Sequence, residues 1–418
     1  MGFSQALSGL NAAADSLDVL GNNIANSQTV GYKSGSAQFA DVFANSQIGL
    51  GTKVSTVLQD FSGGNLESTN RPLDLGISGD GFFRMEQNGQ VVYSRNGQLT
   101  MTPDGYLQNA QGARIMGYGV NAAGAVQVGG QPEVLQIEAD EMPASATTEV
   151  STTFNLDSRK VVDEDLNSVT LAGSDGSTGV EVDYHYSNNF TAYDSLGNPR
   201  NVTVYYEKTG AKTWTGTMAM DGKVLMDETA TPVAAQTLSM EFDTNGQLVT
   251  PADGKFPVTF ASADYFNGAA NDMTLDFDIS GSTQFGNNAS TTALNQNGYT
   301  SGALVGISID SDGTVVRSYS NEQTRPAGQI ALASFRNPEG LSPAGDNTWA
   351  ATDASGQELV GAPGTGLLGG IQSGAIETSN VDMAKELVSM IVTQRAYQAN
   401  SQTIKTQDEV LQTAINLR

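Results

Sequence analysis

The sequence contains no cysteine and only one histidine among its 418 residues. Without cysteine, the chain cannot form a disulfide, a thiolate metal site or a cysteine nucleophile. The single histidine, His185, lies in VEVDYHYSNNF. One histidine cannot form a histidine-based metal cluster, and it has no partner motif that indicates a Ser-His-Asp triad. We therefore expect His185 to be a strand residue beside two tyrosines.

Positive charge is also scarce. Lys and Arg number 20 against 45 Asp and Glu, so the formal net charge is -25. Such a chain repels phosphate backbones and anionic lipid headgroups. The composition therefore argues against nucleic-acid binding and against peripheral membrane binding.

Long hydrophobic runs are absent as well. No stretch approaches the roughly 18 apolar residues of a membrane-spanning helix, and a secretory leader would need a basic start followed by an apolar core. Here the first positive charge is Lys33, and Asp15 and Asp18 interrupt the first apolar segment. We expect a protein without a membrane span that is cytosolic or leaves the cell without a cleaved leader.

The abundant residues indicate a β-rich chain of two to four domains. Hydrophobic residues make up 39% of the sequence, which suits a buried core, and there are 47 glycines. Residues 77–118 alternate short apolar runs with the turn signals Asn88-Gly89, Asn96-Gly97 and Pro103-Asp104-Gly105. The same pattern returns in residues 302–372, with Asp312-Gly313 at a hairpin turn. Antiparallel strands are predicted in both segments.

Residues 143–301 form a third β-patterned stretch, rich in Thr, Ser and Asp. They carry 20 acidic and 7 basic residues, a net charge of -13. The simplest organisation is nested, because an inserted domain needs ends that lie close together. We predict a β domain from residues 71–142 and 302–372, with a second β domain, residues 143–301, inserted into it. Residues 31–70 would be a connecting segment.

The N-terminal segment has the spacing of an amphipathic helix. Its apolar and small residues alternate at intervals of four and three, which is a heptad seam. The helix should fray near Gly21-Asn22-Asn23, because Gly and Asn favour helix ends. The seam consists of Phe3, Leu7, Leu10, Ala14, Leu17, Gly21 and Ile24.

The C-terminal segment predicts a longer helix. Ser379 and Asp382 have capping-box spacing, and a helix from there to Arg418 would be about 57 Å long. Alternating steps of four and three give a seam with an apolar column and a second column that is polar in its middle. The seam consists of Met383, Leu387, Met390, Gln394, Tyr397, Ser401, Ile404, Asp408, Leu411 and Ile415.

Neither helix is expected to be stable alone with its seam exposed. The two helices could pair within one chain and close one domain. Alternatively, the seams could meet those of other copies in an assembly, where a polar column can face neighbours or water. The predicted fold class is mainly β with helical termini: residues 1–30 and 373–418 form a coiled-coil-like core domain, and two nested, discontinuous β-rich domains follow.

Three stretches resemble known ligand-binding motifs but lack the residues or the structural context that each motif requires. GTGLLG (364–369) fits a dinucleotide-binding fingerprint, but no βαβ context surrounds it, so we interpret it as a connector. Asp163 and Asp165 imitate the start of a calcium loop whose later positions are wrong, and Asp310 and Asp312 fit a hairpin turn. No carboxylate pair is identifiable as a general acid and base. We expect no enzyme activity, no cofactor and no metal.

Four stretches together resemble the axial proteins of the bacterial flagellum, which form its rod and hook. They are NNIANSQTVGYKSGSAQF (22–39), RPLDLGISGDGFF (71–83), YSRNGQLTMTPDGYLQNAQGARIMGY (93–118) and the final segment from SNVDMAKEL onward (379–418). The resemblance covers both ends and the flanking β domain, about half the chain. GQIALASFRNPEGLSPAGDNTWAAT (328–352) and the long insertion resemble the hook more than the distal rod.

The resemblance implies a structural subunit of the flagellar hook. Such a subunit would leave through the flagellar type III export apparatus and polymerise under the hook cap into a curved, flexible tube. That tube would lie between the rod and the hook–filament junction proteins and act as a universal joint for torque. A distal-rod subunit is the alternative. The seam residues of both helices, from Phe3 to Ile24 and from Met383 to Ile415, would then form the subunit interface.

Overall fold

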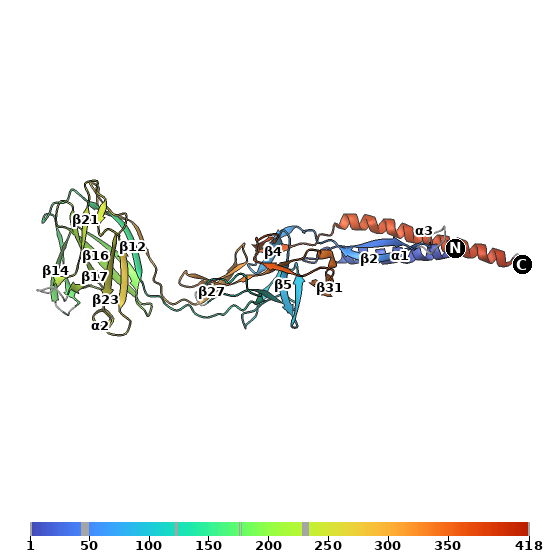
Figure 1. Cartoon of the computed structure of the whole chain (residues 1–418), viewed down its shortest axis with the longest axis horizontal. Helices are drawn as coiled ribbons and strands as arrows, with labels where there is room; N and C mark the ends of the chain where they lie inside the picture. Colours follow the sequence, from blue (N-terminus) through green and yellow to red (C-terminus); the bar gives the residue numbers. More distant parts are fainter. Residues whose placement is uncertain are drawn as a thin grey trace. The chain divides into compact units, whose positions relative to one another are not determined.

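A computed structural model describes residues 2–42, 50–121, 124–174, 176, 178–227 and 234–416. The chain divides into two compact units. The first unit comprises residues 1–139, 305–318 and 324–418, and the second comprises residues 140–304 and 319–323. Strands dominate both units, and the two long helices lie near the two chain ends (Figure 1). The predicted fold class, mainly β with helical termini, is confirmed.

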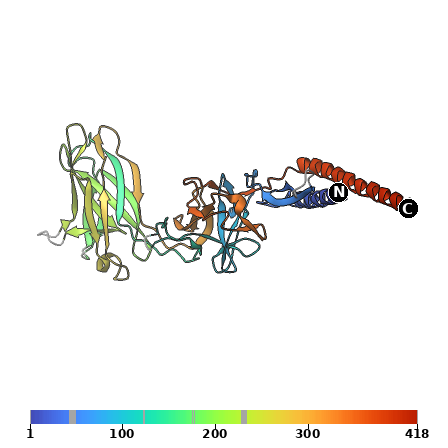
Figure 2. The ribbon, with the colours of Figure 1, turned by 45° about the vertical axis from the view of Figure 1, so that its right-hand side comes forward.

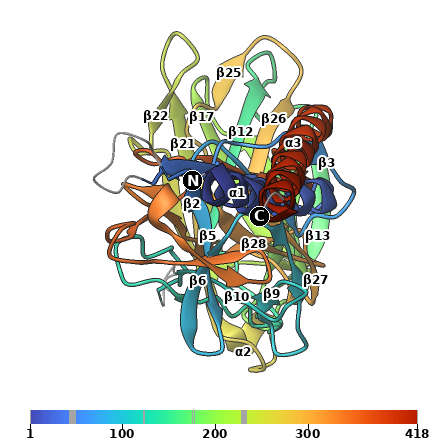
Figure 3. The ribbon, with the colours of Figure 1, turned by 90° about the vertical axis from the view of Figure 1, so that its right-hand side faces the viewer.

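The two long helices of the first unit pack against each other. They are α1 (Gly2–Ala25) and α3 (Met383–Asn416), and they lie side by side in all three views (Figures 1, 2 and 3). The amide of Asn23 donates to Glu386 at 3.3 Å, whereas a Cβ built on Gly9 would lie 2.8 Å from Nδ2 of Asn400. The helices are therefore antiparallel, and α3 continues beyond the start of α1 (Figure 1).

Two details of the predicted helix ends are wrong. Helix α1 does not fray at Gly21 but continues to Ala25, because the side chain of Asn23 bonds to the backbone of Gly35 and not to its own helix end. Helix α3 is capped by Asp382, whose carboxylate accepts the backbone N–H groups of residues 384 and 385 at 2.9 and 3.1 Å. Ser379 lies before the cap and only accepts the N–H of Val381.

Short strands connect the helices to the β body of the first unit. The hairpin of β1 (Gly35–Asp41) and β2 (Thr52–Gln59) contacts α1. After it, β3 (Leu66–Ser68) pairs with β35 (Ala375–Glu377), the strand that precedes α3. A small sheet follows, in which β4 (Asp74–Ser78) lies between β34 (Gly370–Ser373) and β7 (Gly97–Gln98).

The β body is a 13-stranded, branched sheet. Its main path consists, in spatial order, of β27 (Leu304–Ile309), β28 (Thr314–Tyr319), β29 (Thr324–Ile330), β10 (Arg114–Tyr118), β5 (Phe82–Gln87), β6 (Gln90–Ser94), β32 (Thr348–Ala350) and β31 (Ser342–Gly345). Branching from this path are β8 (Thr100–Met101), β9 (Leu107–Gln108), β11 (Glu133–Val134), β30 (Leu332–Ser334) and β33 (Leu359–Gly361). A 3₁₀ turn (Pro338–Gly340) precedes β31.

Most of the predicted turns of this body are confirmed. Asn88 and Gly89 both have positive φ and join β5 to β6 in a tight hairpin. Gly105 and Gly313 also have positive φ, at turns between β8 and β9 and between β27 and β28. The turn predicted at Asn96-Gly97 is wrong. Gly97 lies in strand β7, where a Cβ would come within 2.1 Å of the carbonyl oxygen of Leu75, so glycine is needed there for close strand approach.

The second unit consists of two sheets packed over a shared core (Figure 2). Both contribute aromatic side chains to that core, including Phe154 and Phe277 from one sheet and Trp214 and Tyr206 from the other. The five-stranded sheet contains β12 (Glu149–Asp157), β23 (Lys255–Phe260), β24 (Met273–Asp278), β25 (Thr283–Phe285) and β26 (Ser290–Gln296). The eight-stranded sheet contains β13 (Asn167–Gly173), β14 (Thr178–Tyr184), β15 (Tyr186–Tyr193), β16 (Pro199–Lys208), β17 (Thr213–Met220), β18 (Lys223–Val224), β21 (Thr237–Phe242) and β22 (Leu248–Thr250). The remaining elements are the pair β19 (Met226–Asp227) and β20 (Ala234–Ala235) and the short helix α2 (Ser262–Tyr265).

An ion pair stabilises one side of the β body in the first unit. The guanidinium of Arg84 donates two bonds to the carboxylate of Glu358, at 2.9 and 3.1 Å, and the hydroxyl of Tyr93 donates a third at 2.6 Å. Burial alone would raise the pKa of Glu358, but these hydrogen bonds and the charge of Arg84 lower it below its usual value. Burial and the same carboxylate raise the pKa of Tyr93.

This geometry predicts acid sensitivity of the β body. Because the pKa of Glu358 is lower in the folded state, its stabilisation is complete above the usual glutamate pKa of about 4.3 and is lost as pH falls through the folded-state value. Glu358→Gln should lower the free energy of unfolding by about 1–3 kcal/mol at neutral pH and make it less dependent on pH below about 4.3. Urea unfolding at several pH values measures both effects.

The readout and the control are available in the chain. Of the two tryptophans, Trp349 is buried in the first unit and Trp214 in the second, so a Trp214→Phe background leaves the fluorescence of Trp349 to report on the β body. Glu339→Gln changes an exposed carboxyl on the nearby 3₁₀ turn and serves as the control. An unchanged pH dependence in Glu358→Gln would contradict the prediction.

Candidate assembly interface

The face of α3 that packs against α1 is mostly polar. Its partly buried side chains recur at helical spacing, and Asn400 lies against Gly9 of α1. On α1 the fully buried hydrophobic residues are the small Ala6, Ala12 and Ala13, while Leu10, Leu17 and Ile24 are partly buried. The partly buried residues of α3 are Glu386, Ser389, Met390, Thr393, Asn400, Ser401, Ile404 and Gln407.

Most of the large apolar side chains of α3 are instead exposed. Val388 is 62% exposed and Val392 is 60% exposed, and both share a helical stripe with Leu387 (45%) and Ile391 (50%) because they lie one turn apart. Near the end of the helix, Val410 and Leu411 are similarly exposed. We call the four residues 387, 388, 391 and 392 the apolar stripe. A contiguous exposed stripe of this kind marks an interaction surface.

The predicted seam divides between these two environments. Met390, Ser401 and Ile404 are partly buried on the side of α3 that faces α1, as are Leu10, Ala14, Leu17 and Ile24 on α1. Phe3 and Leu7 on α1, and Met383, Leu387, Gln394, Tyr397, Asp408 and Leu411 on α3, are exposed. The side chain of Ile415 and the predicted helix end at Arg418 lie outside the described residues.

Heptad counting missed part of this surface. Val388, Ile391, Val392 and Val410 are exposed and apolar but fall outside the steps of four and three. The available signal was the pair of adjacent apolar residues Ile391-Val392, which widens the apolar face beyond a single seam.

The helices are joined to the β body by a buried cluster of charges that sequence reasoning did not single out. We call Lys33, Arg95 and Glu377 the junction cluster; their side chains are 0%, 2% and 1% exposed. The carboxylate of Glu377 accepts from Nζ of Lys33 at 2.7 Å and from Nη1 of Arg95 at 3.1 Å. Burial lowers the pKa of Lys33, and the neighbouring Glu377 partly offsets this. One carboxylate thus holds two buried cations.

Asparagines of the two terminal motifs surround this cluster. Asn23 bonds to both backbone groups of Gly35 and donates to Glu386. Asn380 accepts the N–H of Ser34 at 2.8 Å and donates to the carbonyl of Asp60 at 2.8 Å. The Asn-rich stretch and the SNVD stretch therefore lie together in space, where they tie the helix ends to the connecting segment.

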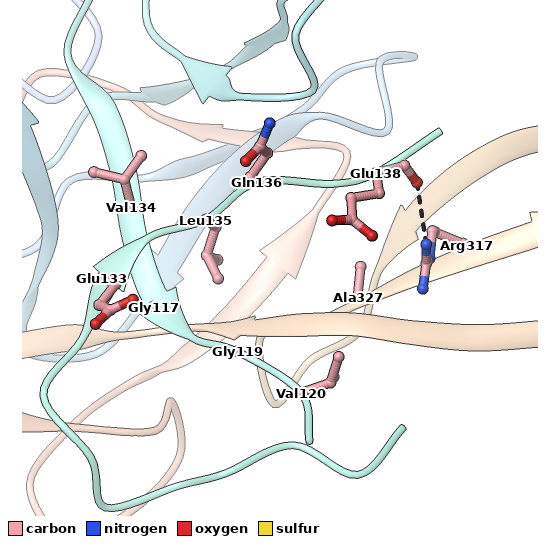
Figure 4. Close-up of a pocket in the computed structure, with 10 residues that line it drawn as sticks. All are labelled: Gly117, Gly119, Val120, Glu133, Val134, Leu135, Gln136, Glu138, Arg317 and Ala327. Atoms are coloured by element: carbon pink, nitrogen blue, oxygen red, sulfur yellow. Dashed lines mark hydrogen bonds between the residues drawn. The ribbon is translucent and has the colours of Figure 1, made fainter. Parts of the chain in front are cut away.

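A cavity of about 400 Å³ lies beside β10 and β11 in the same unit (Figure 4). Its one buried charged side chain, Arg317, donates to the backbone carbonyl of Glu138 at 3.0 Å. The side chains of Glu133 and Glu138 on its lining are exposed. The lining thus holds no buried acid and base side by side.

The apparent ligand sites have structural partners. The expectation that His185 is a strand residue is wrong, because it lies at the bend between β14 and β15, between its two tyrosines. Its Nδ1 accepts the N–H of Lys208, and its Nε2 faces two carbonyl oxygens at 3.1 Å. Residues 364–369 form the turn between β33 and β34. No group of three or more His, Asp or Glu residues suited to a metal ion occurs among the described residues, and no helix described there could cross a membrane.

Family models match successive parts of the chain. Residues 4–33 match the flagella basal body rod protein model, and residues 372–417 match the flagellar basal body rod FlgEFG protein C-terminal model. Residues 76–157 match the flagellar hook protein FlgE/F/G D1 domain, and residues 165–299 match the flagellar basal body protein FlaE D2 domain.

Full-length relatives are more specific. The flagellar hook protein FlgE of Escherichia coli (strain K12) is 45% identical over 423 residues, covering 100% of both chains. That of Borreliella burgdorferi (strain ATCC 35210 / DSM 4680 / CIP 102532 / B31) is 32% identical over 453 residues, covering 99% of this chain and 98% of the relative. The crystal structure of Helicobacter pylori flagellar hook protein FlgE2 shares the fold, with a TM-score of 0.50 at 12% identity, over 75% of this chain and 100% of that one.

These matches confirm the resemblance inferred from the four sequence stretches, and they favour the hook over the distal rod, since the full-length relatives are named as hook proteins. The chain belongs to the flagellar hook protein family.

Proposed function

We propose that the chain is the repeating subunit of a bacterial flagellar hook, in which copies polymerise through their terminal helices into a curved, flexible tube. The observation that carries this proposal is the apolar stripe of α3, because it is exposed in the single chain while a polar face of the same helix packs on α1. Contacts that repeat head to tail without closing generate a helical polymer.

The seam predicted from the sequence and the apolar stripe together define the proposed interface. Helix α1 would contribute Phe3 and Leu7, whose side chains are 47% and 43% exposed. Helix α3 would contribute the apolar stripe, Tyr397 and Leu411. The partly buried seam residues would hold α1 and α3 together within a subunit, and the exposed ones would contact neighbouring subunits. Both interpretations of the heptad seam, a pair within one chain and a contact between copies, would then apply.

The remaining parts of the chain would serve the flexibility of the tube. The acidic segment 143–301 would form polar contacts of low apolar area, which can break and re-form as the tube bends. The tube would act as a universal joint that transmits torque from the rod to the filament. Membership of the family supports rod proteins, the hook cap, the hook–filament junction proteins and the type III export apparatus as partners, with export that needs no cleaved leader. Catalysis is not part of the proposed role.

The first test is assembly itself. In a concentrated kosmotropic salt, which strengthens apolar burial, the purified chain should polymerise into tubes. Negative-stain electron microscopy checks this outcome and shows whether the tubes are curved. A chain that remains monomeric at all salt concentrations would contradict the proposed function.

The apolar stripe predicts a sharper test. Burial of the two valines in the interface contributes about 3–6 kcal/mol per subunit to the free energy of polymerisation. Burial of carboxylates in their place would oppose polymerisation further. The double change Val388→Asp and Val392→Asp should therefore raise the critical concentration for polymerisation more than about a hundredfold. Sedimentation of the polymer measures it, and circular dichroism of the monomer should show retained helix.

The matched control is the double change Val161→Asp and Val249→Asp in the second unit, which adds the same two charges on valines that are 53% and 50% exposed. It should leave the critical concentration within about threefold of the parent, as surface changes usually do. Equal effects of the control and the stripe variant would show that added charge, not the stripe, controls assembly.

A further inference from the structure

We propose that the cavity beside β10 and β11 is a binding site for a small organic carboxylate, with the guanidinium of Arg317 as its anchor (Figure 4). All residues that line the cavity belong to the first unit. The site is separate from the proposed helix interface. Its test uses the unassembled chain, so its failure and a failure of polymerisation are distinguishable.

Arg317 is a buried cation without an acidic partner in the part of the chain that the structure describes. It lies in β28 and is 9% exposed. Its Nη1 donates to the backbone carbonyl of Glu138 at 3.0 Å, and its Nε is buried without a hydrogen-bond partner. A buried charge that lacks a counter-charge is strongly unfavourable, and an unsatisfied buried donor is rare in native folds. Arg317 therefore indicates an anion that no described residue supplies.

A second arginine adds positive charge at the same place. Arg325 of β29 is the partner of Arg317 in the antiparallel register. Residues directly opposite each other project from the same face of a sheet, where like charges repel. Arg325 likewise forms no ion pair with a described residue, and a Cβ built on Gly124 would lie 3.4 Å from its Nε. Gly124 follows the cavity residues Gly119 and Val120 in the same loop, so both arginines lie next to the cavity lining.

The rest of the lining suits the aliphatic part of a small ligand. The cavity volume is about 400 Å³, which lies in the usual range for small-molecule sites. The apolar side chains of Val120, Leu135 and Ala327 are on the lining with Arg317 (Figure 4). A guanidinium binds a carboxylate through two parallel hydrogen bonds. The ligand would therefore place its carboxylate at Arg317 and a short aliphatic chain against the apolar side chains.

Two acidic residues on the lining restrict the charge of the ligand. The side chains of Glu133 and Glu138 are exposed, and neither forms an ion pair with Arg317. Their carboxylates are screened by water and salt, so they repel a ligand with one negative charge only weakly. A ligand with two or three carboxylates would meet more repulsion and gain no further cation. A monocarboxylate is therefore the class that the cavity fits.

Titration of the unassembled, full-length chain with butyrate tests the site, with chloride added to keep the ionic strength constant. Nuclear magnetic resonance of a chain with isotope-labelled arginine follows each Nε–H group. The signals of Arg317 and Arg325 should shift and saturate with a dissociation constant of about 10 mM or lower. Acetate should bind at least about fourfold more weakly, because it buries less apolar surface. Equal binding of the two carboxylates, or no saturation below about 100 mM butyrate, would overturn the proposal.

Arg317→Gln removes the anchoring charge and should weaken butyrate binding, followed at Arg325, at least about tenfold. The control is Arg336→Gln, which removes an exposed arginine of the same unit and should leave butyrate binding as in the parent. The fluorescence of Trp349 in the Trp214→Phe background shows whether each variant keeps a folded β body. Equal weakening in both variants, or unchanged binding in Arg317→Gln, would contradict the assignment of Arg317 as the anchor and overturn the proposal.

The same carboxylate chemistry has two sources, a free molecule and an acidic side chain of a second copy of this chain, which carries 45 Asp and Glu. Sedimentation of the polymer distinguishes them. If a side chain of a second copy occupies the cavity, butyrate and Arg317→Gln should each raise the critical concentration for polymerisation. If a free carboxylate is the ligand, neither should change it. Both results support the site, which is overturned only by the binding measurements on the unassembled chain.

If Arg317→Gln does not fold, Arg325→Gln provides a milder test. It leaves Arg317 and its bond to the carbonyl of Glu138 in place and removes only the neighbouring charge. Butyrate binding, now followed at Arg317, should weaken about threefold or more, because the second cation no longer attracts the carboxylate. Binding as tight as in the parent would show that the two arginines do not share an anion, and it would overturn the proposal.

Discussion

The carboxylate of Glu377 between Lys33 and Arg95 is a buried interaction that joins the segments flanking both terminal helices to the β body. A buried ion pair is a poor source of net stability, because both charges lose their hydration. Its loss would be costly, because Lys33 and Arg95 would then be two buried cations without a carboxylate partner. Here it joins Lys33, the turn at Arg95 and the N–H of Gly64 to the strand that precedes α3.

That division of roles suits a subunit with two states of association. A helix pair stabilised by a large internal apolar seam would have little apolar surface left for its neighbours. In this chain the face of α3 toward α1 is mostly polar, with Met390 and Ile404 as its partly buried apolar residues, and the valines and leucines of α3 are exposed. Polar bonds join the helix ends to the β body, and exposed apolar side chains remain available for association.

The sequence predicted periodic and local features well. Asn88-Gly89 and Asp312-Gly313 specify turns within a few residues, and the spacing of apolar residues at both ends specifies helices. Prediction from the sequence failed where the position of a helix end depends on residues distant in the chain. Ser379 and Asp382 are both good caps locally, and only the packing of the preceding strand decides between them. Asn23 was assigned to a helix end because its tertiary partner, Gly35, is invisible to propensity.

The junction cluster shows the same limit more sharply. Glu377 is separated from Lys33 by 344 residues and from Arg95 by 282 residues, and each of the three is an ordinary charged residue in its local sequence. The heptad spacing likewise indicated that the helices are amphipathic but not which face of α3 packs against α1. The spacing determines which residues share a face of a helix and does not identify the partner of that face. The apolar stripe, and with it the best candidate interface, required the fold.

Net charge adds the last constraint on association. Copies that each carry a charge of -25 repel one another, and about half of that excess lies in residues 143–301, outside the helices. In the proposed assembly the apolar stripe would have to overcome repulsion that acts over about a Debye length, whereas the attraction would act only at contact. Two chains would then gain little from a misaligned encounter. Only a docking that buries the stripe over many neighbours at once would outweigh the repulsion, so acidity would make assembly more selective for the correct register.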